Sequence, residues 1–342
     1  MREIRHDAFS GSFIGQCVGD ALGFIVQGQL ESVCRGHVDA VLGGAVGSHD
    51  PHGRIPEIHR GIYPMGQYSD DSQLARELMI SYRDNQGFVP EDYAARISRI
   101  FARHEVVGGG RATREAAERL EAGIPWQEAG APAPEAGSGS AMRAGPVGLF
   151  FHDDPETLVR AALEQGLITH ADTRCQAGSV AIAGAVALAM TEDEIVPRAF
   201  LKRLTQWTDP VDADMSDALM RLADWIGLTP EKALRFIARA GRPMNHRDMW
   251  LGIPPYVVGS VLWALYSFLR SPDDFRETLR TAVIVGGDVD TTGAMAGAIS
   301  GARNGLDQIP WGMADRLNDQ GTWTLQELMM LAEECQEMVA AA

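Results

Sequence analysis

Apolar residues recur along this chain mainly at intervals of three and four, which is typical of helices with one buried face. Turn sequences such as GLTPEK, RSPDDF and HDDPET separate the segments that show this spacing. Alternating strand patterns are scarce, and VIVGG at 283–287 comes nearest to one. We therefore predict an all-α fold, with helices over residues 71–83, 91–103, 112–122, 155–165, 174–190, 197–207, 213–226, 230–240, 256–270, 273–284, 291–303 and 324–340.

Three helical segments carry a small residue at every fourth position, which places these residues on one helix face. Each glycine inside a helix costs about 1 kcal/mol relative to alanine, so the stripes indicate helices whose backbones approach closely. Asp20 and Arg303 interrupt the segments, which favours a tight core over pairing in a membrane. The stripes are Gly11, Gly15, Gly19 and Gly23, then Ala177, Ala181, Ala185 and Ala189, then Gly293, Gly297, Gly301 and Gly305.

Two segments rich in glycine and proline, 43–68 and 123–146, are predicted to be long loops, and loops of this length are usually functional or disordered. Neither resembles a linker between two folded units. We therefore predict one domain over residues 1–342.

Composition narrows the choice of partners and of compartment. The formal net charge of −16 argues against nucleic acid or an anionic membrane as a partner. The four cysteines form no CxxC pair, as expected of reduced thiols in a cytoplasmic protein. The N-terminus has no apolar signal core, and the longest nearly apolar run, 177–190, is short for a membrane span. These features predict a cytoplasmic location and say nothing about oligomeric state.

Two predicted helix starts carry more oxygen side chains than a cap requires. SDDS at 69–72 has two adjacent aspartates, and GGDVDTT at 286–292 has two aspartates and two threonines. Capping explains each group alone, since Ser and Asp accept hydrogen bonds from the free N–H groups of a helix. Considered together, they are hard oxygen ligands that suit Mg²⁺, Mn²⁺ or Ca²⁺. If the two starts meet, their carboxylates repel one another unless cations neutralise them.

These two groups, together with three further motifs, resemble the ADP-ribosylglycohydrolase family. The further motifs are GDALG at 19–23, GSGSAMRAGPVGL at 137–149 and ITH at 168–170, and the second helix start extends to GGDVDTTGAMAGAISGARNG at 286–305. All appear in the order found in that family and span most of the chain. The resemblance implies an all-α orthogonal multi-helix bundle with a dinuclear metal cleft at helix N-termini.

The resemblance also implies hydrolysis of the bond that joins C1 of the ribose in ADP-ribose to an acceptor. The implied acceptor is arginine on an ADP-ribosylated protein, or the acceptor part of a related small ADP-ribosyl compound. The implied cofactors are two divalent cations, Mg²⁺ or Mn²⁺, and Asp70 or Asp71 is implied to activate the attacking water. The implied metal ligands are Ser69, Asp70, Asp71, Asp288, Asp290 and Thr291. The implied ADP-ribose-binding residues are Gln27, Gly137, Ser138, Gly139, Ser140, Met142 and His170.

The chain also departs from the family pattern. Gln27 stands where many relatives have glutamate, Ser138 stands where asparagine is usual, and only Glu105 is acidic in the 105–110 region, where relatives often have aspartate. Arg143 is expected to pair either with an anionic ligand or with a buried carboxylate. These departures favour an alternative to the hydrolase, namely a weak or inactive, crystallin-like protein that binds ADP-ribose. A second alternative is a two-metal phosphoesterase that releases AMP.

Overall fold

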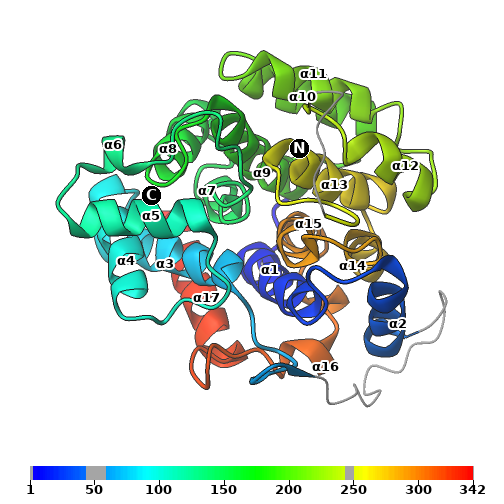
Figure 1. Cartoon of the computed structure of the whole chain (residues 1–342), viewed down its shortest axis with the longest axis horizontal. Helices are drawn as coiled ribbons and strands as arrows, with labels where there is room; N and C mark the ends of the chain where they lie inside the picture. The colour runs from blue at the N-terminus through cyan, green and yellow to red at the C-terminus, as the bar shows by residue number, and fades with distance from the viewer. Residues whose placement is uncertain (1–2, 44–58, 243–249, 342) are drawn as a thin grey trace.

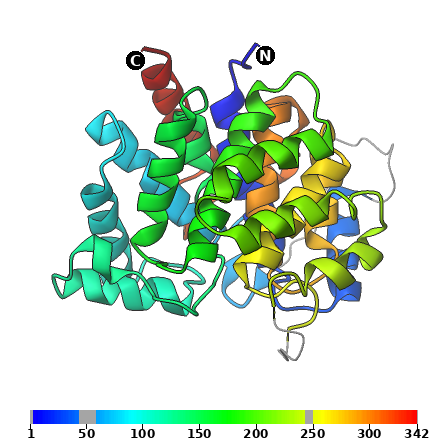
Figure 2. The same cartoon turned by 90° about the horizontal axis from the view of Figure 1, so that it is seen from above.

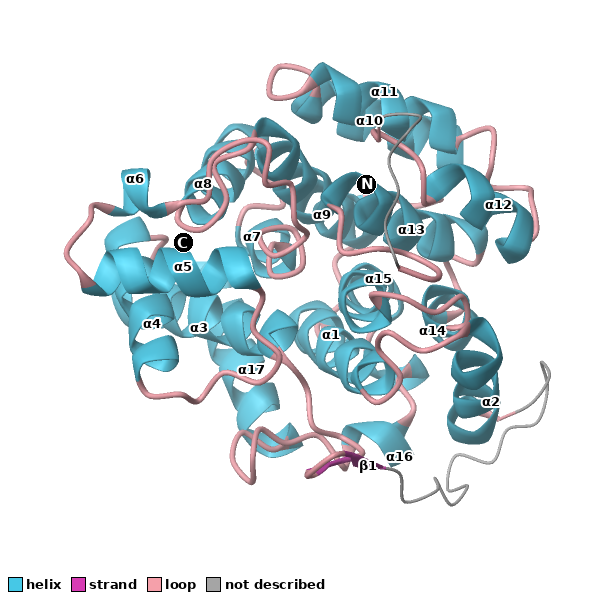
Figure 3. Cartoon of the chain, in the orientation of Figure 1, coloured by secondary structure: helices cyan, strands magenta, loops and turns pink. Residues whose placement is uncertain are grey.

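The computed structural model describes residues 3–43, 59–242 and 250–341, whose regular secondary structure is almost entirely helical (Figures 1 and 3). Strand β1 (His59–Arg60) pairs antiparallel with β2 (Tyr63–Pro64). The helices are α1 (Ala8–Phe24), α2 (Glu31–Leu42), α3 (Asp70–Asn85), α4 (Pro90–Ala102), α5 (Arg111–Glu121), α6 (Trp126–Ala129), α7 (Gly145–Phe150), α8 (Pro155–Leu167), α9 (Thr173–Thr191), α10 (Pro197–Thr208), α11 (Ala213–Leu222), α12 (Pro230–Ile237), α13 (Val257–Arg270), α14 (Phe275–Val283), α15 (Val289–Asn304), the 3₁₀ turn η1 (Leu306–Gln308), α16 (Trp311–Ala314) and α17 (Leu325–Ala341).

The predicted all-α class is confirmed, and each of the twelve predicted helices has a counterpart in the structure. The strand-like VIVGG is not a strand: α14 ends at Val283, and Gly286 and Gly287 turn the chain with φ of 77° and 91°. The predicted loop at 123–146 contains α6 and the first residues of α7. In the predicted loop at 43–68, residues 44–58 lie outside the described residues and the hairpin β1–β2 follows them.

Helices α1 and α15 cross the centre of the molecule side by side and antiparallel (Figures 1 and 2). Their glycine stripes face each other: a Cβ atom on Gly15 would lie 2.5 Å from the carbonyl oxygen of Gly297, and one on Gly11 2.6 Å from that of Gly301. The Ser12 hydroxyl donates to the carbonyl oxygen of Ala298 at 2.9 Å across the same seam. The expected close backbone approach is therefore confirmed. It packs a helix from near the start of the chain against a helix that lies more than 250 residues later.

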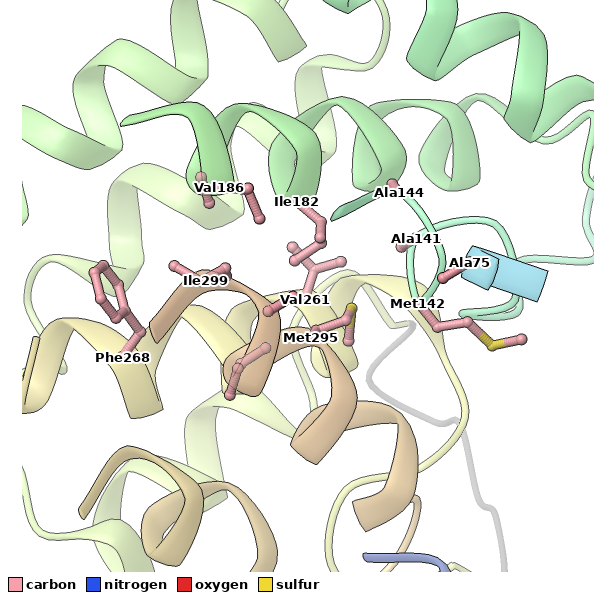
Figure 4. Packing of buried hydrophobic residues seen from close by; sticks show 14 of the residues in the cluster. Ala75, Ala141, Met142, Ala144, Ile182, Val186, Val261, Phe268, Met295 and Ile299 are labelled. Atoms are coloured by element: carbon pink, nitrogen blue, oxygen red, sulfur yellow. The ribbon is translucent and has the colours of Figure 1, made fainter. Parts of the chain in front are cut away.

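The alanine stripe lies on α9, which packs against α7, α8, α10, α13 and α15. Helix α9 is long and apolar enough to cross a membrane by length and composition, but 89% of its most apolar window is buried inside the protein. In Figure 4, Ile182 and Val186 of α9 point toward Met295 and Ile299 of α15 within one apolar cluster. The stripe is therefore part of the core of this bundle.

Candidate functional site

The first of the two oxygen-rich helix starts is the N-terminus of α3. Ser69 is the N-cap, and its hydroxyl accepts a hydrogen bond from the N–H of Asp71 at 3.3 Å. The N–H of Asp70 donates to the carbonyl oxygen of Val107 at 2.7 Å, and Gly109 N–H donates to Asp70 Oδ1 at 2.9 Å. The segment before α5 therefore holds the Asp70 carboxylate from outside α3.

The second start is the N-terminus of α15, where Asp288 is the N-cap residue. Its N–H donates to the carbonyl oxygen of Ile253 at 2.7 Å, and a Cβ atom on Gly287 would lie 2.1 Å from the same oxygen. Only glycine fits there, so the Gly-Gly turn presses α15 against the segment before α13. Asp288, Asp290 and Thr291 are all buried.

Asp20 of α1 connects the two starts, and the sequence comparison gave it no role. Its carboxylate accepts hydrogen bonds from Ser69 N–H at 3.0 Å, from the Ser69 hydroxyl at 2.8 Å and from Ser72 N–H at 3.0 Å. A Cβ atom on Gly23, one turn further along α1, would lie 2.5 Å from the Cα of Asp290. The sequence contained one indication of this role: Asp20 lies within the glycine stripe of a helix that the stripe predicts to be buried.

Five carboxylates therefore share one buried region, which we call the aspartate cluster: Asp20, Asp70, Asp71, Asp288 and Asp290. Burial raises the pKa of Asp20 to about 7 and that of Asp70 to about 6. Burial and the charges of the other four carboxylates raise the pKa of Asp71 well above its ordinary value. Burial, with the charges of Asp288, Asp20 and Asp70, does the same for Asp290. The cluster is thus a buried site of excess negative charge.

The donor chemistry of the cluster fits divalent cations. Asp71 Oδ1 is buried and has no hydrogen-bond partner among the described residues, which is costly for a carboxylate oxygen. Within the described ranges, no three His, Cys, Asp or Glu side chains already enclose a metal position. Two of the carboxylates are engaged within their own helix starts: Asp71 Oδ2 lies 2.9 Å from the Ser69 hydroxyl oxygen, and Asp290 Oδ1 accepts from Thr291 N–H at 3.0 Å. Ion binding therefore requires some of these bonds to be exchanged for metal contacts.

Gln27 follows the end of α1 and lies between the guanidinium of Arg60 and the aspartate cluster. Arg60 Nη1 donates to Gln27 Oε1 at 2.8 Å, which directs the side-chain amide N–H toward Asp288 Oδ1 at 3.3 Å. The Arg60 guanidinium also stacks over the Phe24 ring, 4.4 Å from its centroid. Gln27 thus donates to a predicted metal ligand, and its own role toward substrate stays a prediction.

The segment 137–142 runs along one side of the cluster. The Ser138 hydroxyl donates to Asp288 Oδ2 at 3.3 Å. Ser140 is fully buried, where its hydroxyl donates to the carbonyl oxygen of Cys175 at 3.2 Å, and Met142 packs in the core beside Ala75 and Ala141 (Figure 4). The structure therefore places Ser138 at the cluster and gives Ser140 and Met142 packing contacts that hold the segment in place.

A chain of hydrogen bonds orients His170 against the glycines of this segment. Arg143 Nη2 donates to Thr169 Oγ1 at 2.8 Å, so the Thr169 hydroxyl hydrogen points to His170 Nδ1, also at 2.8 Å. Nδ1 is then the acceptor and Nε2 carries the proton. A Cβ atom on Gly139 would lie 3.1 Å from Nε2, and one on Gly137 3.5 Å from it. The Nε2 edge of the His170 ring therefore lies close against the glycines of the segment.

Among the described residues, Arg143 forms no ion pair with a buried carboxylate, and its pairing with an anionic ligand stays a prediction. Its guanidinium donates to Gln165 Oε1 at 3.0 Å and to Thr169, and it lies over the Tyr93 ring, 5.5 Å from the centroid. Burial lowers the pKa of Arg143, and the charge of Asp70 opposes this shift. The side chain is fully buried, and its hydrogen bonds to Gln165 and Thr169 hold the turn between α8 and α9 in place.

Comparisons with known proteins show the family of this chain. A sequence profile of the ADP-ribosylglycohydrolase family matches residues 1–341, and the chain belongs to this family. It is 29% identical over 340 residues to ADP-ribosylhydrolase ARH3 of Xenopus tropicalis, covering 92% of this chain and 93% of that protein. It is 26% identical over 334 residues to ADP-ribosyl-(dinitrogen reductase) glycohydrolase of Rhodospirillum rubrum, covering 92% of this chain and 91% of that protein.

A solved structure described as an ADP-ribosylglycohydrolase-related protein complex has the same fold. It superposes with a TM-score of 0.67 at 28% sequence identity, and 98% of each chain is covered. The all-α fold inferred from the sequence is therefore shared with a member of the same family.

Proposed function

We propose that this protein is a metal-dependent hydrolase that cleaves the glycosidic bond between ADP-ribose and an acceptor. The family and the names of the relatives support hydrolysis of ADP-ribose conjugates. The observation that carries the metal dependence is the aspartate cluster, in which five buried carboxylates face one another and Asp71 Oδ1 has no partner among the described residues. Ser69, Asp70, Asp71, Asp288, Asp290 and Thr291 would hold two cations, Mg²⁺ or Mn²⁺.

Bound cations would offset the negative charge of the cluster and make a nearby water more acidic. The protein's own residues then have three tasks. Gly109 N–H fixes Asp70, and Gln27 and Ser138 fix Asp288, through the hydrogen bonds described above. His170 supports the glycine backbone of segment 137–139, where N–H groups without large side chains suit phosphate oxygens. Either Asp70 or Asp71 accepts the proton of the attacking water, since the amide of Gln27 is not basic.

Hydrolysis adds the water oxygen to C1 of the ribose, breaks the bond from C1 to the acceptor and transfers a proton to the leaving group. The developing positive charge on the sugar ring favours nearby carboxylates. We propose a protein as the acceptor, because one relative is named for ADP-ribosyl dinitrogen reductase, which is a protein conjugate. Arginine as the modified side chain is what the family resemblance implies.

A hydrolysis panel tests this proposal. Arginine-, serine- and guanine-linked ADP-ribose are each incubated with the protein in Mg²⁺, Mn²⁺ or EDTA. We expect release of intact ADP-ribose from the arginine conjugate with a divalent cation and none in EDTA. Release of AMP would instead identify a phosphoesterase, and equal turnover in EDTA would exclude metal dependence.

A second candidate function is ADP-ribose binding without turnover. Gln27 favours it, because this position has an amide that is engaged with Arg60 and Asp288 instead of a carboxylate that can take a proton. Tight binding of ADP-ribose with no release from any conjugate in the panel would support this alternative.

A further inference from the structure

A cavity lined by no residue of the aspartate cluster lies between α11, α12 and the start of α9. Its volume is about 790 Å³, within the range of about 300–1,000 Å³ that small-molecule sites occupy. Helices α11 and α12 lie at the periphery of the bundle, away from the α1–α15 pair (Figure 1). We call this cavity the arginine pocket; its charged lining residues are Arg174, Arg221, Arg235, Arg239, Arg242, Asp214 and Asp217.

The pocket concentrates positive charge in a protein whose net charge is −16. Among the described residues, the side chains of Arg221, Arg235 and Arg239 form no ion pair or hydrogen bond. Asp214 and Asp217 line the same cavity but pair with none of the three within that part of the chain. Guanidinium groups that share a cavity and lack carboxylate partners are suited to phosphate oxygens, which they bind through paired N–H donors.

The pocket also has an aromatic wall. The rings of Trp225 and Phe236 are stacked, with centroids 5.6 Å apart and planes inclined by 16°. Phe236 is 51% exposed and lines the pocket, so part of its ring is accessible to a ligand there. An exposed flat face beside cationic groups suits a ligand that carries a planar ring as well as phosphate.

Arg174 forms an oriented edge of the pocket. Its guanidinium is held by Asp172 Oδ2 at 2.6 Å, and Nη1 donates to the Tyr256 hydroxyl at 3.2 Å. Because these bonds already fix the side chain, little conformational entropy is lost there when a ligand binds.

We propose that the arginine pocket binds a nucleoside phosphate. Arg221, Arg235 and Arg239 contact the phosphate, and the Trp225–Phe236 stack contacts the base. The inference does not rest on the proposed function, because no residue of the aspartate cluster lines this pocket.

Isothermal titration of the full-length protein with AMP, and separately with inorganic phosphate, tests the proposal. EDTA is present throughout, so that cations at the aspartate cluster play no part. We expect Arg235→Gln/Arg239→Gln to weaken AMP binding by about tenfold or more, since hydrogen bonds to charged groups are lost. We expect Phe236→Ala to weaken AMP binding while phosphate affinity stays unchanged.

The matched control is Arg99→Gln/Arg103→Gln, which removes two exposed arginines with the same spacing of four, near the end of α4. Arg221→Gln provides an independent variant should the double variant fold poorly. Equal AMP affinity in the wild type, in Arg235→Gln/Arg239→Gln and in Arg221→Gln would overturn the proposal. An equal loss in the control pair would also overturn it, because the binding would then reflect general charge. The titration measures binding and needs no turnover. Its result therefore tests the arginine pocket even if the protein proves not to be a hydrolase.

Discussion

Gly19 of α1 and Gly293 of α15 face each other backbone to backbone. A Cβ atom on Gly19 would lie 2.0 Å from the Gly293 carbonyl oxygen, and one on Gly293 would lie 2.4 Å from that of Gly19. Asp20 and Asp290 lie next to this crossing and both belong to the aspartate cluster. The closeness of the two helices therefore determines whether the carboxylates from distant parts of the chain can act on one ligand.

Gly19→Ala should destabilise the protein and disrupt the cluster together. The added methyl group meets rigid backbone on the facing helix, so we expect a loss of about 2 kcal/mol or more in the free energy of unfolding. Gly36→Ala in α2 is the control, because nothing lies within 4 Å of its Cβ position. Alanine there should stabilise the protein by about 0.5–1 kcal/mol through helix propensity. Chemical denaturation measures both changes, and equal effects of the two variants would contradict this account of the seam.

Gly108→Ala should impair catalysis beyond its effect on stability. Gly108 has φ of 92°, and a Cβ atom there would lie 2.8 Å from Asp70 Oδ1. Gly123→Ala is the matched control, since Gly123 has φ of 86° with nothing within 4 Å. Both variants strain the backbone by roughly 1 kcal/mol, but only the first displaces Asp70. We expect kcat/KM to fall about tenfold or more in Gly108→Ala alone; a similar fall in Gly123→Ala would assign the effect to backbone strain.

Asp71→Asn should separate stability from metal binding. Without divalent cations, burial and the four other carboxylates disfavour the charged form of Asp71 and raise its pKa, and asparagine removes this cost. We expect a rise of about 1 kcal/mol or more in the free energy of unfolding in EDTA. Mg²⁺ should raise the Tm of the wild type by mass action and leave the Tm of Asp71→Asn unchanged. Glu118→Gln, on the exposed face of α5, is the control. A Tm that responds equally to Mg²⁺ in the wild type and in Asp71→Asn would contradict the ligand role.

His170 should make the protein less stable in acid. Burial, and next the charge of Arg143, lower the pKa of His170 from 6.5 to about 3. Between these values the unfolded chain binds a proton that the folded protein does not, so the stability contributed by neutral His170 is present above pH 6.5 and is lost as the pH falls toward 3. The measurement compares the wild type with His170→Gln over this range, where the variant should show a shallower loss. NMR of the wild type should show a neutral imidazole protonated at Nε2, and titration of His170 near its ordinary pKa would refute the prediction.

The local patterns in the sequence were sufficient for the fold class and for the two helix starts. Apolar spacing located the long helices because their buried faces repeat with the helical period, and the register of glycines predicted the seam before any partner was known. The short helices α6, α7 and α16 escaped this reasoning, since they contain too few residues to show a repeat. Helix α2 also escaped it, although Cys34, Val38, Val41 and Leu42 have the spacing of one helix face. The motifs also indicated the family, which the sequence profile confirms.

Tertiary structure alone decided which residues meet. Asp20 links the two helix starts because α1 and α15 cross at glycines, a pairing between residues more than 250 positions apart that no local pattern encodes. Arg60 of the hairpin β1–β2 reaches Gln27, 33 positions away, and the arginine pocket assembles from α9, α11 and α12. Periodicity reports which face of a helix is buried. The neighbour that covers this face is decided by shape and charge complementarity over the whole core, and this property exists only in the folded chain.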